Sequence, residues 1–251
     1  MSPESEPSAI PHPLFHDSVV RGLFSPAVHL GQAVRHPIES ARHHQIWTEI
    51  RIGGRDNLRS HVGPLIMAMV HRSGMDPLVA SVAANKTAKV RINMMAKKEI
   101  WDAPVIGRPL GHVLEAGGTF PIDRSKWLDQ DTVGRIGKIF KRGGVLGIFP
   151  EEHRREGDIV DPKHLKPGTA ALALQFGVPI MPVGLAGTHD NEFGPVGVVF
   201  GEKLPVWEIP GLNIANIRTI ARSRKAIDPL TESLGERMQI AQDEAISLRQ
   251  R

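Results

Sequence analysis

Residues 65–77 read Leu-Ile-Met-Ala-Met-Val-His-Arg-Ser-Gly-Met-Asp-Pro. The first six, Leu65–Val70, are continuously apolar, as is typical of a central strand buried on both faces of a parallel sheet. His71 follows at the end of this strand. Asp76 stands directly before Pro77, an arrangement that favours the first turn of a helix. The stretch therefore predicts a buried strand, a tight turn and a helix, which together are the repeating unit of an α/β sheet.

The pair His71 and Asp76 has two interpretations. On one continuous helix their five-residue spacing would put them on different faces, but Ser73-Gly74 allows the chain to turn between them. Asp76 would then accept a hydrogen bond from one ring nitrogen of His71, leaving the other nitrogen to face a substrate hydroxyl. In the alternative, Asp76 is a plain helix N-cap and His71 is a structural residue at a strand end. The spacing alone favours neither.

The same alternation continues along the rest of the chain. We expect strands at residues 47–52, 65–70, 90–95, 119–122, 145–149, 179–185 and 196–200, the last as an edge strand. We expect helices at residues 77–84, 128–141, 168–176 and 229–248. The prediction is an α/β fold with a mostly parallel central sheet flanked by helices.

Composition narrows the classes of function. The chain has 251 residues, enough for one large domain or two small ones, with the apolar (41%) and charged (23%) content of an ordinary globular protein. It contains no cysteine, so it has no disulfide framework, thiol nucleophile or cysteine-ligated metal. The formal charge of +4 suits an anionic surface or an anionic small substrate, and is too small to argue for nucleic acid.

Residues 1–46 differ from the remainder, so we expect two parts, residues 1–46 and 47–251. A Ser/Pro/Glu-rich start precedes an amphipathic segment, Leu14–Phe24, and a His/Arg-rich one, Val28–Trp47. These segments either pack on the domain as a helix pair or lie in a membrane interface, and one helix can do both. The start lacks the features of a secretory signal, which favours a cytoplasmic chain. The uncharged run 167–188 is broken by glycine and proline, so no transmembrane helix is predicted.

Candidate site residues follow the predicted strands, where α/β sheets bind ligands. His71 is one of these candidates, and two further segments contain others. Residues 118–124 read Gly-Thr-Phe-Pro-Ile-Asp-Arg, and residues 149–155 read Phe-Pro-Glu-Glu-His-Arg-Arg. Residues 178–183 read Val-Pro-Ile-Met-Pro-Val. These blocks, in this order, resemble those of the glycerolipid acyltransferase family typified by lysophosphatidic acid acyltransferase. The resemblance spans residues 58–188 and includes Ala-Lys-Lys-Glu at 96–99 and Lys-Pro-Gly at 166–168.

The resemblance implies roles for matching residues. His71 would be the general base and Asp76 its orienting partner. Arg124 and Arg154 would bind the acceptor phosphate. Glu151 would complete this phosphate-binding pocket by holding the basic groups or glycerol hydroxyls in place, and Pro182 would support the acyl-binding wall. The resemblance also implies that residues 47–251 form the catalytic domain and contain a tunnel for the acyl chain. The co-substrate would be acyl-CoA or acyl-acyl carrier protein, and no metal or other cofactor would be needed. The protein would bind a lysophospholipid and lie as a peripheral protein on the inner face of the cell membrane. If acyl-acyl carrier protein is the donor, the carrier protein would be a partner too, and no nucleic acid is expected.

The residues themselves agree with such chemistry. A phosphomonoester carries about −1.5 to −2 charges near neutral pH, and the planar fork of arginine suits it. A thioester is already activated, so a base that deprotonates the attacking hydroxyl is sufficient. The sequence has neither a G-x-S-x-G elbow nor a cysteine, so it carries no signature of an acyl-enzyme nucleophile. Direct transfer to a lysophospholipid follows, with 1-acyl-sn-glycerol 3-phosphate as the leading acceptor and phosphatidic acid as the product.

The chain also departs from the family pattern. Val70 stands where the family has asparagine, and Glu152, His153 and Arg155 replace the glycine, threonine and serine of its third block. Glycerol 3-phosphate, another lysolipid, or a different hydroxyl or amine acceptor therefore stay open. Two other classes are a non-catalytic lipid-binding relative and an anion- or nucleic-acid-binding module. The basic cluster that motivates the module has no interleaved aromatic residues; it comprises Arg218, Arg222, Arg224 and Lys225.

Overall fold

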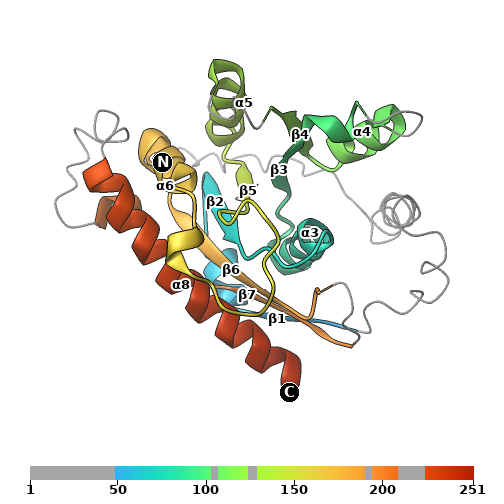
Figure 1. Ribbon diagram of the computed structural model, residues 1–251, viewed down its shortest axis with the longest axis vertical. Coiled ribbons are helices and arrows are strands. Elements are labelled where there is room, and N and C mark those ends of the chain that lie inside the picture. Colours follow the sequence, from blue (N-terminus) through green and yellow to red (C-terminus); the bar gives the residue numbers. More distant parts are fainter. Residues whose placement is uncertain (1–48, 103–106, 124–128, 190–193, 209–223) are drawn as a thin grey trace, which may run out of the picture. The chain divides into compact units, whose positions relative to one another are not determined.

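The computed structural model describes residues 49–102, 107–123, 129–189, 194–208 and 224–251 (Figure 1). All of them belong to one compact unit, His43–Arg251. The two helical segments expected within residues 14–47 lie outside the described residues, as do Arg124, Arg218 and Arg222.

The described residues form a seven-stranded sheet with the order β1-β7-β6-β2-β5-β3-β4. Neighbouring strands are parallel except for the antiparallel pair β6 and β7. The bounds are β1 Ile50–Gly53, β2 Leu65–Met69, β3 Ile92–Lys97, β4 Thr119–Ile122, β5 Val145–Ile148, β6 Ile180–Ala186 and β7 Val196–Phe200. The predicted α/β fold with a mostly parallel sheet is confirmed.

The strand β2 lies at the centre of the sheet, as its apolar sequence predicts. It pairs with β5 on one side and β6 on the other, and all five of its residues are buried. The prediction of an edge strand at residues 196–200 is wrong, because β7 lies between β1 and β6 and is buried throughout. Its sequence, Val-Gly-Val-Val-Phe, has the continuous apolar character of an interior strand, and β1 takes the edge instead.

Helices cover both faces of the sheet. Their bounds are α2 Arg55–Arg59, α3 Asp76–Ala88, α4 Gly107–Ala116, α5 Gln130–Lys141, α6 Gly168–Phe176 and α8 Arg224–Gln250, with 3-10 turns η2 Lys98–Ile100, η4 Pro162–His164 and η5 Val206–Glu208. One core cluster joins the sheet to α5, α6 and α8 through Ile136, Leu172 and Leu234. A second cluster joins the sheet to α2 and α3 through Leu58 and Val79. Of these helices, α2 and α4 were not predicted.

The C-terminal helix α8 lies unusually close to the sheet, running along β6 and β7 (Figure 1). Gly184 and Gly197 make this possible, because a Cβ atom at either position would overlap the backbone of α8 at Ala241 or Ala245. The helix begins at Arg224, ahead of the predicted start at Pro229. None of the helices in the described part of the chain is long and apolar enough to cross a membrane.

The parallel strands bring the predicted site segments together. Strands β2, β5, β3 and β4 point in one direction, so the segments that follow them lie at one edge of the sheet. These segments include His71 after β2 and Glu151 after β5.

Candidate active site

The turn between β2 and α3 is held by the carboxylate of Asp76. Its Oδ2 atom accepts hydrogen bonds from His71 Nδ1 (2.9 Å) and from the backbone N–H groups of Arg72 (2.6 Å) and Ser73 (2.7 Å). The carboxylate is fully buried. Since an ionised carboxylate only accepts, Nδ1 donates this hydrogen bond, and in a neutral imidazole Nε2 is then the acceptor. This contact is the one expected if Asp76 orients His71 toward a substrate hydroxyl.

Asp76 is not the N-cap of the helix α3, as the alternative interpretation would require. The N-cap residue of α3 is Met75, which makes no side-chain capping bond, and Asp76 is the first helical residue. Its side chain is directed back to the turn that precedes the helix, instead of to the free N–H groups of the first helical turn. Pro77 removes one of those N–H groups, so the helix start needs one acceptor fewer.

The imidazole ring of His71 is also held from its face. The ring centroid of Phe149, at the end of β5, lies 4.3 Å from that of His71 with the planes tilted by 32°. The backbone of His71 is fixed on both sides, because its N–H donates to Glu151 Oε2 (2.8 Å) and its carbonyl oxygen accepts from the N–H of Arg155 (3.0 Å). The loop after β5 therefore fixes the backbone of His71 and contacts one face of its ring, while Asp76 holds the ring through Nδ1.

Behind His71 is a buried ion pair between Arg72 and Glu151. The Nη1 atom of Arg72 lies 2.9 Å from both carboxylate oxygens of Glu151, and the two side chains are almost fully buried. Arg72 also donates to the carbonyl oxygens of His71 and Ile159. Such a pair is costly to break, because either partner alone would leave a buried charge. Arg72 was not predicted, since an arginine beside a candidate base carries no local signal of burial.

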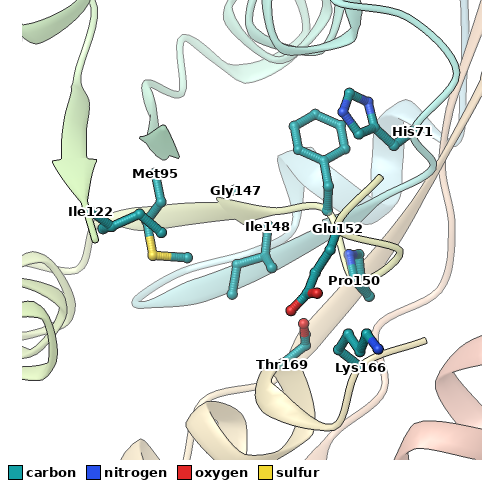
Figure 2. A pocket seen from close by; sticks show the side chains of 10 residues that line it. His71, Met95, Ile122, Gly147, Ile148, Pro150, Glu152, Lys166 and Thr169 are labelled. Carbon is teal, nitrogen blue, oxygen red and sulfur yellow. The ribbon is translucent and has the colours of Figure 1, made fainter. Parts of the chain in front are cut away.

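A pocket opens beside His71 where β2, β3, β4 and β5 end (Figure 2). It is lined by His71, Met95, Ile122, Gly147, Ile148, Phe149, Pro150, Glu152, Lys166 and Thr169. Met95 and Ile122 form an apolar end, and Glu152, Lys166 and Thr169 form a polar end that includes the start of α6 (Figure 2). A pocket with an apolar end, a polar end and a histidine can accommodate an amphiphile with a reacting hydroxyl.

The remaining predicted site residues are placed as follows. Glu151 was expected to complete the acceptor pocket by holding basic groups or glycerol hydroxyls in place. Its oxygens accept from Arg72 and from the backbone N–H of His71, so it positions the turn that carries His71. Arg154 is exposed in the same loop and does not line the pocket described above. Pro182 lies within β6 with its ring near Gly201, and the apolar lining comes from other residues. In the described part of the chain, no three acidic or histidine side chains are grouped to hold a metal ion.

Comparisons with known proteins point to one family. The family model named Acyltransferase matches residues 49–186, more than half of the chain. This match includes His71, Asp76, Arg124, Glu151 and Pro182. It also includes the pocket described above.

Curated relatives carry one activity in their names. A 1-acyl-sn-glycerol-3-phosphate acyltransferase of Bacillus subtilis is 24% identical over 193 residues, covering 75% of this chain and 86% of the relative. An enzyme of the same name from Borreliella burgdorferi is 28% identical over 63% of this chain and 59% of its own length. A chloroplastic one from Brassica napus is 28% identical over 55% of this chain and 37% of its own length.

One solved structure has a similar fold. The 1-acyl-sn-glycerophosphate (LPA) acyltransferase PlsC of Thermotoga maritima is 15% identical to this chain, and each chain is covered to 93% with a TM-score of 0.53. At this identity, the likeness concerns the fold alone.

The buried pair yields a stability prediction. We expect Glu151→Gln to lower the free energy of unfolding by about 3 kcal/mol, because it leaves the Arg72 charge buried without a counter-charge. Urea denaturation followed by circular dichroism measures this change. Glu156→Gln, an exposed change in the same loop, should stay within about 0.5 kcal/mol of the parent. The double variant Arg72→Met/Glu151→Leu should recover much of the loss, and a fully stable Glu151→Gln would contradict the burial of the pair.

Proposed function

The chain belongs to the acyltransferase family, and from this premise we propose that it moves a fatty acyl group from a thioester donor to the hydroxyl of a lysophospholipid. The observation that carries the proposal is the 2.9 Å contact between His71 Nδ1 and the buried Asp76 carboxylate beside a pocket with an apolar end. The names of the curated relatives favour 1-acyl-sn-glycerol 3-phosphate as acceptor, which makes phosphatidic acid the product and phospholipid biosynthesis the process. Glycerol 3-phosphate and other lysolipids are the alternative acceptors.

The proposed reaction is a direct transfer within a ternary complex. The unprotonated Nε2 of His71 takes the proton of the acceptor hydroxyl as its oxygen bonds to the thioester carbonyl carbon. The carbon–sulfur bond then breaks, and the proton passes from His71 to the leaving thiolate. Asp76 keeps the ring in the required tautomer and stabilises the imidazolium that forms between these steps. Acyl-CoA and acyl-acyl carrier protein both supply such a thioester, and either serves as donor in this scheme without a further cofactor.

Substitutions in the His71–Asp76 pair test this proposal. His71→Ala should reduce acyl transfer by at least about 10²-fold, since the base is removed. Asp76→Asn should reduce turnover by about 10²- to 10⁴-fold, while its amide oxygen still accepts from the turn, so the melting temperature should fall only slightly. The assay follows thiol release from an acyl-CoA with 1-acyl-sn-glycerol 3-phosphate and identifies the lipid product by mass spectrometry. His164→Ala, an exposed histidine in η4, is the control. Unchanged turnover in His71→Ala would refute the mechanism.

We assign the acceptor phosphate to the arginines that the family pattern indicates, Arg124 and Arg154. Arg124→Ala should raise the apparent KM for a phosphorylated acceptor by about tenfold or more, because a charge-assisted fork contact is lost. The KM for the acyl donor should change little. Initial-rate measurements at varied acceptor concentration, with Arg135→Ala on α5 as control, decide the matter. An unchanged KM indicates that this arginine does not contact the phosphate.

We further propose that the enzyme works as a peripheral protein at the inner face of the cell membrane, because the proposed acceptor and product are membrane lipids. The amphipathic pattern of residues 14–24 supports this proposal. A variant that lacks residues 1–45 should lose co-sedimentation with vesicles that contain anionic phospholipid. Co-sedimentation equal to that of the full chain would assign these residues to packing on the domain instead.

A further inference from the structure

Glu152 has an unusual backbone conformation. Its φ angle is +57°, and among the described residues other than glycine only Lys89 shares a positive φ. Lys89 is the C-cap of α3, a place where the left-handed conformation is common. Glu152 instead stands at the middle of a tight turn, closed by the N–H of His153 donating to the carbonyl oxygen of Glu151 at 2.6 Å. The family pattern has glycine here, and this chain keeps the turn while carrying a side chain that the turn disfavours.

The side chain retained at this cost faces the pocket. Glu152 lines the pocket together with His71, Lys166 and Thr169, and its carboxylate is directed toward Thr169 at the start of α6 (Figure 2). A residue held in a disfavoured conformation at a site is a mark of function rather than of stability. The acceptor pocket therefore contains a carboxylate that a glycine at this position would not supply.

Lys166 places the opposite charge in the same pocket. Its backbone N–H donates to the carbonyl oxygen of Pro150, which fixes the chain here next to the loop after β5. Within the part of the chain that the structure describes, no ion pair joins Lys166 to Glu152, so each charge is left to act on a ligand. The polar end of the pocket thus presents one negative and one positive group beside His71.

We propose that Glu152 and Lys166 form a subsite for a zwitterionic headgroup, so that the favoured acceptor is a lysophospholipid with a phosphodiester-linked ammonium group. Lys166 adds to the attraction that Arg124 and Arg154 are proposed to exert on the phosphate. Glu152 attracts the ammonium group and repels the second negative charge of a phosphomonoester. This inference rests on the proposed acyl transfer at His71 and changes the preference among its acceptors.

The test compares three acceptors that share one acyl chain: the 1-acyl-sn-glycerol 3-phosphate, the 3-phosphoethanolamine and the 3-phosphoglycerol. For each acceptor, kcat/KM is measured with the full chain and an acyl-CoA. We expect the parent to favour the ethanolamine acceptor over the phosphate. Glu152→Gln keeps the size of the side chain and removes its charge, and should lower this ratio by about fivefold. Glu156→Gln, an exposed change in the same loop, should leave the ratio unchanged.

The variant Glu152→Gly tests whether the side chain serves acceptor selectivity rather than the stability of the fold. Glycine adopts a positive φ without strain, so this variant should melt at the same temperature as the parent or higher while losing the same selectivity. A ratio unaltered in both variants overturns the inference and leaves acyl transfer intact. An equal loss for the phosphoglycerol acceptor also overturns it, because Glu152 would then bind hydroxyl groups rather than an ammonium group. Failure of the parent to acylate any of the three refutes the proposed function, and the inference with it.

Discussion

A single buried oxygen, Oδ2 of Asp76, organises the turn on which the site depends. It accepts one ring N–H and two backbone N–H groups within three consecutive residues, 71–73. Without a compensating acceptor, these groups would be costly to bury at the end of the central strand. The same contacts that hold the turn also determine the tautomer of His71. In this turn, the stability of the fold and the orientation of the proposed base therefore depend on one carboxylate.

A second buried carboxylate couples the turn to the neighbouring strand. Glu151 follows β5, and its contacts to Arg72 and to the backbone of His71 join it to the end of β2. Because β2 and β5 are parallel neighbours, their ends meet and a short loop can bridge them. The loop that holds Glu151 continues at once into Glu152, which lines the pocket. The proposed selectivity element thus stands next to a residue that is anchored by buried contacts.

Local patterns predicted a large part of this arrangement. The apolar run at residues 65–70 indicated a central strand, and the Lys-Pro-Gly sequence indicated the start of α6 at Gly168. The patterns failed where the outcome depended on partners far along the chain. The apolar residues of β7 suit an interior strand, but they do not specify β1 and β6 as its neighbours, and this pairing decides its place in the sheet. The helix α2 is five residues long, too short for a periodic signal.

The sequence by itself determined the α/β class, the strand ends at which polar residues gather, and the residue types from which acyl-transfer chemistry is built, because these follow from short-range periodicity and local turn residues. Only the tertiary structure decided which contacts each of those residues makes. It turned Asp76 away from the helix cap, paired Glu151 with Arg72, and directed Glu152 into the pocket. The contacts of Asp76 are local, but its burial is set by the surrounding fold. The contacts of Glu151 join segments about 80 residues apart, and pairing at that distance leaves no mark on the local sequence.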